Sequence, residues 1–388
     1  MGGALTPRPR AFLLTLPLLL LVGAAFLIPL CVALFTSVQD SEVSAALPRT
    51  AALLRAWDGA GLPDDAVFPV LAEELAAAER GQAIGALIRR LNFEQPGARS
   101  LLLRAARAGA QDRAGLAALD ARWGQTGTWR LLRRGSGPFT DLYLLRALDL
   151  ARDGSGRIVD VAPDQALFRD VFGRTFGIGL LVTALTLVLA YPVAATLARA
   201  TGTLGRVGLA LVLMPFWISI LVRATAWFIL LQREGPINAL LVATGLLERP
   251  AQLMFTRFAV VLAVVHVMLP FAILPLFAVM RRMDGGLLQA ARGLGAAPWQ
   301  VFLRVHLPLA LPGVMAGGGI VFLIAVGFWV TPALVGGPGD QMVGAFIAAY
   351  VSETLNWGMA AALAVLLLLG TAASMLALWA PLRLAWPR

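Results

Sequence analysis

The sequence predicts an all-α integral membrane protein with about six transmembrane helices, and three observations support this fold class. Hydrophobic residues make up 59% of the 388 residues and charged residues only 14%, whereas soluble domains are about 45–50% apolar and about 25% charged. Several intervals without charge are as long as the roughly 20 apolar residues that a helix needs to cross a bilayer. The arginines are also concentrated in the segments that join these intervals on one side.

Each predicted span corresponds to one apolar run, and the third run is interrupted only by Arg223. The first run follows Arg8 and Arg10 as a signal peptide would, but it exceeds the 7–15 apolar residues of a signal. We therefore expect an uncleaved anchor there. The predicted spans lie near residues 11–36, 175–197, 209–231, 258–280, 311–335 and 358–381.

The distribution of arginine predicts the orientation. Arginines outnumber acids at the N-terminus, between residues 199 and 206, between 281 and 304, and at the C-terminus. Because cytoplasmic loops carry an excess of basic residues, both termini are predicted to be cytoplasmic in a multi-pass protein of the bacterial inner membrane. The arginines are scattered in short loops and form no basic arm, so the net charge of +10 does not indicate nucleic-acid binding.

Residues 39–170 differ from the rest in composition, since their acidic and basic residues balance and Gly and Pro interrupt them repeatedly. Apolar residues recur at helical spacing in 67–78 and 98–107. We expect a mostly helical extracytoplasmic insertion, because long loops cross the membrane largely regardless of charge. A structural cap and a docking surface for a binding protein are both open interpretations. The predicted organisation is 1–38 for the N-terminus and first span, 39–170 for the insertion, and 171–388 for a five-helix core.

The loop of residues 284–308, predicted to be cytoplasmic, has strong local signals. Asp284 suits the N-cap of a short helix, and Gly295 suits the left-handed position that ends it. Pro298 suits the first turn of a second helix, which Pro308 is expected to stop. The second helix would place Trp299, Phe302, Leu303 and His306 on one amphipathic face along the membrane surface. An ordinary amphipathic connector remains an alternative.

The same loop resembles the EAA loop of binding-protein-dependent ABC permeases, in which Glu-Ala-Ala, three residues, Gly, nine residues and Ile-x-Leu-Pro follow one another. The matching positions keep this spacing: Gln289, Ala290, Ala291, Gly295, Val305, Leu307 and Pro308. The resemblance implies that this loop forms the coupling helix, which sits in a cleft of an ATPase subunit, and that Gln289 to Gly295 make the contact. Gln289 departs from the pattern, because an amide forms hydrogen bonds but no ion pair.

The resemblance extends over about residues 170–388 and is strongest to the spermidine/putrescine-type permeases. It rests on residues 214–227, 235–238 and 330–338 as well as the loop. It implies an ABC importer type I permease arrangement, a second permease subunit and a periplasmic solute-binding protein as partners, and a polyamine-like or other small organic solute as cargo.

Polar residues inside the spans are candidates for gating or for the substrate pathway. For Arg223 we favour a structural or gating role over cargo contact, since a fixed cation repels a polyamine. For His266 an interhelical hydrogen bond is favoured over a ligand role. For Trp227 both an interfacial and a pore-facing position are open, and an interfacial belt is the default.

The sequence predicts no catalytic residue, metal site or cofactor. It contains no lysine, so it lacks the Lys of a P-loop, and ATP hydrolysis is expected in a separate ATPase chain. Two rivals to an importer subunit remain. A secondary carrier is disfavoured because no Asp or Glu lies within a predicted span to act as a relay. A membrane-anchored sensor or scaffold, with residues 39–170 as its sensor, leaves the loop motif unexplained.

Overall fold

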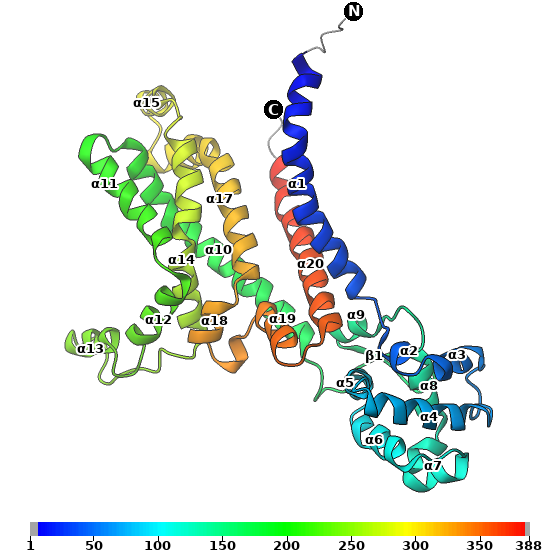
Figure 1. Ribbon diagram of the computed structural model, residues 1–388. Helices are drawn as coiled ribbons and strands as arrows, with labels where there is room; N and C mark the ends of the chain where they lie inside the picture. Colours follow the sequence, from blue (N-terminus) through cyan, green and yellow to red (C-terminus); the bar gives the residue numbers. More distant parts are fainter. Residues whose placement is uncertain (1–6, 385–388) are drawn as a thin grey trace, which may run out of the picture. The chain divides into compact units, whose positions relative to one another are not determined.

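The computed structural model describes the backbone of residues 7–384 and the burial of residues 14–378. The chain forms two compact units, one of residues up to 166 together with 350–366, the other of 167–349 together with 367 onward. Within the described residues the chain is helical apart from one two-stranded hairpin and an isolated bridge, which confirms the all-α fold class (Figure 1).

The elements follow one another without long unstructured segments. The first span and the insertion comprise α1 (Pro7–Thr36), α2 (Glu42–Ala46), α3 (Pro48–Ala56), α4 (Val67–Arg80), α5 (Ile84–Glu94), α6 (Ala98–Ala108), α7 (Arg113–Leu119), η1 (Ala121–Gly124), α8 (Thr126–Arg134), α9 (Leu142–Ala147), β1 (Leu150–Arg152) and β2 (Ile158–Asp160). The remainder comprises α10 (Phe168–Arg199), α11 (Gly202–Leu213), η2 (Met214–Trp217), α12 (Ile220–Leu230), α13 (Pro236–Ala243), α14 (Arg257–Met280), α15 (Gly285–Gly293), α16 (Pro298–Val301), the π-helical η3 (Phe302–His306), α17 (Leu307–Gly327), α18 (Val330–Val335), η4 (Pro338–Asp340), α19 (Val343–Ser352) and α20 (Trp357–Leu384).

Among residues 7–384, five helices are long and apolar enough to cross a bilayer, and the number is six if one bent pair is counted as a single span. The predicted span at 209–231 is not one continuous helix, because α11 with η2 meets α12 at 97° (Figure 1). Pro215 lacks an N–H donor and lies in the 3₁₀ turn of η2, and Ile218 and Ser219 are extended. The helical ladder therefore stops between Trp217 and Ile220.

The predicted span 311–335 also differs from the observed helix. α17 ends at Gly327, where Phe328 takes an extended conformation, and Val330 begins the separate α18. At the other end the helical path starts earlier than expected, since α16, η3 and α17 together make one span from Pro298 to Gly327. The spans at α1, α10, α14 and α20 agree with the prediction within a few residues at most ends.

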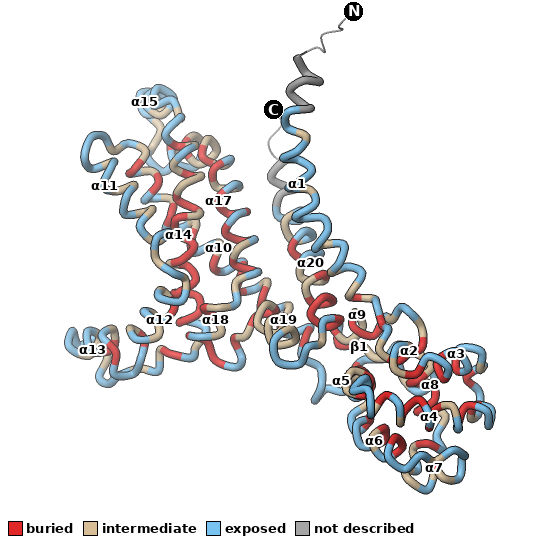
Figure 2. The backbone as a smooth tube through the Cα atoms, viewed as in Figure 1, coloured by how far each residue is buried: buried red, intermediate tan, exposed pale blue. Residues whose placement is uncertain are grey.

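The insertion has a core of its own, built by one face of each short helix (Figure 2). Phe68 packs edge-on against Trp129 with their ring centroids 5.3 Å apart, and Trp129 donates its indole N–H to the carbonyl of Trp123 at 2.9 Å. The carboxylate of Glu74 accepts the main-chain N–H groups of Arg49 and Thr50, which begin α3. The helical patterns of 67–78 and 98–107 are confirmed as α4 and α6, whereas the three-residue strands were missed.

Two ionic groupings fix the insertion. Arg90 is 4% exposed and bonds the fully buried Asp40 through its Nε at 2.7 Å, and it also pairs with Glu94 at 3.0 Å. Nearer the surface, hydrogen bonds from the Arg122 guanidinium lower the pKa of Asp120 to about 2. The Arg90–Asp40 pair joins residues 50 positions apart, so it holds a tertiary contact in place, whereas Asp120 and Arg122 belong to one turn, η1 with its cap.

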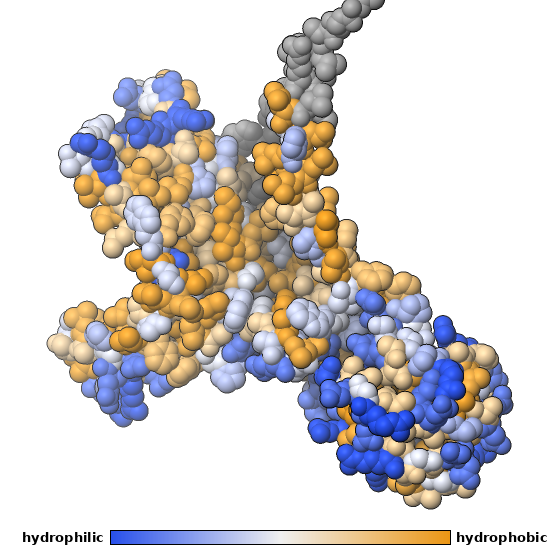
Figure 3. Space-filling model, viewed as in Figure 1, coloured by the Kyte–Doolittle hydropathy of each residue, from blue (hydrophilic) through white to orange (hydrophobic). Residues whose placement is uncertain are grey.

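The core of the second unit lies between α10, α14 and α17 (Figure 2). The helices α14 and α17 approach closely because α17 presents glycine: a Cβ added at Gly313 would lie 3.1 Å from the Cα of Leu276, and one at Gly317 would lie 3.1 Å from the carbonyl oxygen of Ala272. Small residues allow such packing where lipid replaces water. Apolar surface covers the visible sides of α1 and of these helices, whereas hydrophilic surface predominates on the insertion (Figure 3).

Candidate functional site

The loop between α14 and α17 begins with the predicted cap. Asp284 accepts the N–H of Gly286 at 2.8 Å through Oδ1, and α15 runs from Gly285 to Gly293. A carboxylate at this position satisfies one of the free N–H groups of the first turn. The short helix predicted to follow an Asp284 cap is therefore confirmed, and it begins directly after this residue.

The turn after α15 is closed by main-chain hydrogen bonds. Gly295 has φ +82° and donates to the carbonyl of Arg292 at 3.0 Å, and Ala296 donates to the carbonyl of Ala291 at 3.2 Å. The left-handed conformation predicted for Gly295 is therefore confirmed. The side chain of Gln300 accepts the N–H of Ala297 at 3.0 Å, and Pro298 starts α16 as predicted. The turn between α15 and α16 is thus fixed by local chemistry.

The second helix does not end at Pro308, and this expectation is wrong. Residues 302–306 form a π-helical turn that leads directly into α17, with Pro308 in its first turn. Proline has no N–H, and in the first turn of a helix an N–H would have no intrahelical acceptor, so no hydrogen bond is lost there. A π turn changes the hydrogen-bonding register by one residue. The sequence did not reveal this continuation, because proline is found both just after the end of a helix and in a helix's first turn.

The π turn also alters the predicted amphipathic face. Trp299, Phe302 and Leu303 are exposed, but His306 is only 9% exposed and shares a hydrogen bond of 2.6 Å with the hydroxyl of Tyr191 on α10. The ring of Tyr191 also packs edge-on against Phe302 at 5.5 Å. His306 therefore contacts α10 and does not lie on a surface face. Tyr191 is a functional candidate that sequence reasoning missed, although a hydroxyl inside an apolar span signals a need for a partner.

The predicted coupling residues fall into two groups. Gln289, Ala290 and Gly295 are exposed and Ala291 is partly exposed, all on α15 or its turn, and no residue of α15 is buried (Figure 2). Val305, Leu307 and Pro308 are half-buried in the helical path from η3 into α17. The motif thus joins an exposed segment, α15 and its turn, to the start of a membrane-spanning helix.

The intramembrane candidates lie around the bent pair. Trp227 on α12 donates its indole N–H to Nδ1 of His266 on α14 at 3.2 Å. The expected interhelical hydrogen bond of His266 is therefore present. Arg223 lies one turn before Trp227 and is half-buried, and its Nε has no acceptor among the described residues. Arg223, Trp227 and His266 therefore lie on other segments of the second unit than the exposed α15 and its turn.

Among residues 7–384, no group of three or more His, Cys, Asp or Glu side chains is placed to hold a metal ion. Polar side chains elsewhere in the second unit bond the main chain. The side chain of Asn238, for example, bonds the main chain of Gln232 and Ala251 and thereby shapes the loop after α12.

Comparison with known proteins places this geometry in a family. The family described as binding-protein-dependent transport system inner membrane component matches residues 175–384, more than half of the chain. The spermidine/putrescine transport system permease protein PotB of Salmonella typhimurium is 32% identical over 232 residues, which cover 60% of this chain and 79% of that protein. The inner membrane ABC transporter permease protein YdcU of Escherichia coli is 36% identical over 214 residues, covering 51% and 68%.

A solved structure of a bacterial alginate ABC transporter, in complex with a pentasaccharide-bound periplasmic protein, aligns with a TM-score of 0.46 and 18% identity over 54% of this chain and 76% of that one. The family match and the sequence relatives carry the assignment, since they span the helices and the loop described above. The chain therefore belongs to the family of inner-membrane components of binding-protein-dependent transport systems, as an ABC transporter permease.

Proposed function

We propose that this ABC importer permease subunit is driven by cytoplasmic ATPase subunits that hold the loop 284–308. One observation carries the proposal: α15, its turn and the start of α16 present large apolar side chains that are at least half exposed. Leu294 is 89% exposed, Trp299 60% and Leu287 50%. A fixed, capped turn that exposes apolar groups is suited to a partner's cleft, because burial there removes apolar surface from water.

The helical continuity of Pro298–Gly327 suggests how force would travel. Displacement of α15 is transmitted to α17 through η3 without an intervening flexible joint, and Val305, Leu307 and Pro308 lie on this path. The Tyr191–His306 hydrogen bond ties the path to α10. In this proposal ATP-driven closure of the ATPase subunits moves α17 and α10 together and alternates access to a central pathway.

The contact surface is Gln289, Ala290, Ala291 and Gly295. The small side chains of this surface allow a close approach of the partner's backbone. Gln289 supplies hydrogen bonds in place of the ion pair that a glutamate would offer. The permease itself performs no covalent chemistry, and hydrolysis takes place in the ATPase chains.

The remaining partners are a periplasmic solute-binding protein and a second permease subunit. We propose a polyamine-like or other small organic solute as cargo, because the match to the spermidine/putrescine permease PotB extends over 79% of that protein. Arg223 is assigned a structural or gating role beside Trp227 and His266, since its positive charge disfavours contact with a cationic cargo.

The proposal includes an orientation, with both termini and residues 284–308 in the cytoplasm and residues 39–170 outside. It is tested by cysteine labelling in a Cys31→Ser background, using a membrane-impermeant maleimide on intact spheroplasts. Thr354→Cys is expected to react and Leu294→Cys to react only after permeabilisation. Both positions are exposed in the structure, so they form a matched pair. Labelling of Leu294→Cys from outside would overturn the coupling assignment.

Coupling itself is tested with Ala290→Cys in the same background, cross-linked to single cysteines on the cognate ATPase subunit in the assembled complex. Cross-linking that depends on Ala290→Cys and is absent for Thr354→Cys is the expected result. The cargo is tested separately, by calorimetric titration of the cognate binding protein with spermidine and putrescine. Absence of binding there would refute the polyamine assignment and leave the coupling assignment intact.

A further inference from the structure

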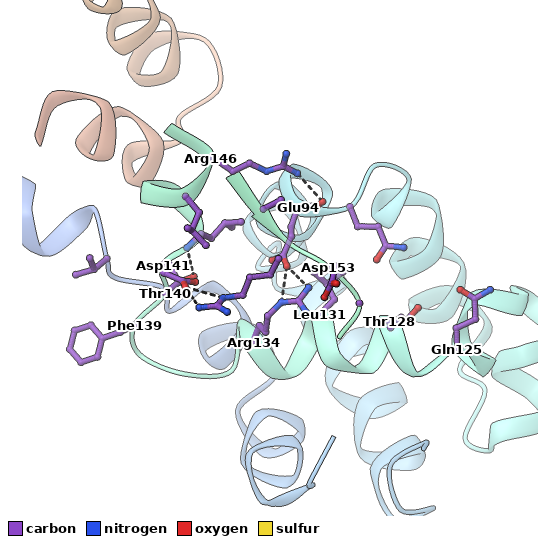
Figure 4. Close-up of a pocket in the computed structure, with 18 residues that line it drawn as sticks. Glu94, Gln125, Thr128, Leu131, Arg134, Phe139, Thr140, Asp141, Arg146 and Asp153 are labelled. Carbon is purple, nitrogen blue, oxygen red and sulfur yellow. Dashed lines mark hydrogen bonds and ion pairs between the residues drawn. The ribbon is translucent and has the colours of Figure 1, made fainter. Parts of the chain in front are cut away.

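The insertion contains a cavity of about 710 Å³, which lies within the 300–1,000 Å³ range of small-molecule sites. Its walls come from the end of α5, from α8, from the turn before α9, from α9 itself and from β1 (Figure 4). The charged residues of the wall are three acids and three arginines: Glu94, Asp141, Asp153, Arg134, Arg146 and Arg152.

The acids of the cavity are already engaged by the protein. Glu94 accepts hydrogen bonds from Arg134 at 2.9 Å and from Arg90 at 3.0 Å. Asp141 accepts a hydrogen bond from Arg152 at 2.9 Å. Arginines of the protein compensate the charge of both carboxylates, so neither carboxylate is free to pair with a cationic ligand.

The third acid is held by its own loop. Hydrogen bonds from the Ser155 hydroxyl, together with main-chain N–H groups of Ser155 and Arg157, lower the pKa of Asp153 to about 2. Asp153 is therefore ionised and occupied at neutral pH. The cavity consequently lacks a free carboxylate among its described lining residues, and its chemistry is set by its arginines.

Arg146 differs from the other two arginines. Arg134 and Arg152 each bond a carboxylate, whereas the contact of Arg146 is a single 3.4 Å hydrogen bond to the main-chain carbonyl of Glu94. Its Nε is buried and so lies beyond the reach of a ligand in the cavity, whereas Nη1 bonds no described residue and Nη2 makes only the long bond to Glu94. A guanidinium is satisfied best by a carboxylate or phosphate that accepts two parallel hydrogen bonds, which Nη1 and Nη2 can donate. Figure 4 shows Arg146 extending from α9 along one wall of the cavity.

The rest of the lining suits an organic body. Leu131, Leu142 and Leu145 line the cavity, and Phe139 stands at its edge, 59% exposed. We propose that this cavity is a binding site for a small organic anion, whose carboxylate or phosphate group bonds Arg146 and whose apolar part packs on these leucines. The site lies outside the transport machinery assigned above and does not depend on the identity of the cargo.

The test uses the full chain in nanodiscs of zwitterionic lipid, without ATPase or binding protein, so that its outcome is independent of transport. Benzoate and inorganic phosphate are titrated calorimetrically, with spermidine as a cationic comparison. We expect saturable binding of at least one anion, no binding of spermidine at this site, and at least a tenfold weaker affinity in Arg146→Gln. Arg99→Gln removes an exposed arginine away from the cavity and should bind as the unaltered protein does.

The proposal is overturned if neither anion binds, if Arg146→Gln binds as tightly as the unaltered chain, or if Arg99→Gln weakens binding equally. Should Arg146→Gln fail to fold by its thermal transition, Arg146→Lys keeps the charge but loses the fork geometry, and an affinity equal to that of the unaltered chain would also overturn the proposal. Repeating the phosphate titration in nanodiscs with phosphatidylglycerol identifies the source: weaker binding indicates a lipid headgroup, and unchanged binding indicates a free solute.

Discussion

Replacement of Gly295 by alanine tests whether the left-handed turn after α15 is needed for coupling. Gly295 has φ +82°, and a Cβ built there would meet no atom within 4 Å. A steric clash with neighbours is thus excluded, and the whole effect comes from the backbone. For an L-residue the left-handed region costs about 1–2 kcal/mol. The native turn should therefore be populated about 5- to 30-fold less relative to alternative turns.

Gly293 provides a matched control two residues earlier. It is exposed, it also has open space where a Cβ would lie, and its φ is not positive. Gly293→Ala should stabilise α15 by about 0.5–1 kcal/mol, because alanine loses less backbone entropy in a helix. Gly295→Asn should fall between the two, since asparagine tolerates the left-handed conformation better than alanine.

The assay is the affinity of the cognate ATPase for the permease in nanodiscs, combined with hydrogen exchange of residues 293–297. Gly295→Ala should weaken ATPase binding about 5- to 30-fold and accelerate exchange in the turn, while Gly293→Ala leaves the affinity unchanged or higher. Equal affinities for Gly295→Ala and Gly293→Ala would refute the role of this turn as a preformed contact surface.

Three further predictions concern contacts within one or the other of the two units. Tyr191→Phe removes the hydrogen bond to His306 and should lower stability by about 0.5–1.5 kcal/mol, seen as a lower melting temperature; an unchanged melting temperature together with unchanged ATPase coupling would exclude a role for this bond. Asp120 has a pKa of about 2 in the folded protein against an ordinary 3.8, so the stability that its ionised form contributes is present above pH 4 and is lost as the pH falls through 2. Asp120→Asn should therefore flatten the acid unfolding curve, followed by tryptophan fluorescence, between about pH 4 and pH 2. Parallel curves for the two proteins would contradict this. Gly358→Ala places a Cβ 2.3 Å from the ring of Tyr143, so it should cost about 1–3 kcal/mol in thermal unfolding, and an unaltered transition would show that the ring moves freely.

The candidate coupling loop was predictable where its chemistry is local. The Asp284 cap, the left-handed Gly295 and the Pro298 start each depend on a residue's own side chain and its nearest main-chain neighbours. The helical continuity from η3 into α17 through Pro308 was not predictable, because a proline in the first turn of a helix and a proline after its last turn look alike in sequence. The contact of Tyr191 with His306, 115 residues apart, depends on how α10 packs and leaves no local signal.

By itself the sequence determined the all-α membrane class and the approximate spans, because the bilayer imposes a length of apolar helix that can be counted along the chain. It also determined the capped turn of the loop. Only the tertiary structure decided the 97° angle in the third predicted span, the burial of Asp40 with Arg90 and the cavity beside Arg146. The physical reason is that caps and tight turns depend on neighbouring residues, whereas ion pairs and cavities arise between segments that only folding brings together, and Pro215 interrupts a helix without setting the angle of the bend.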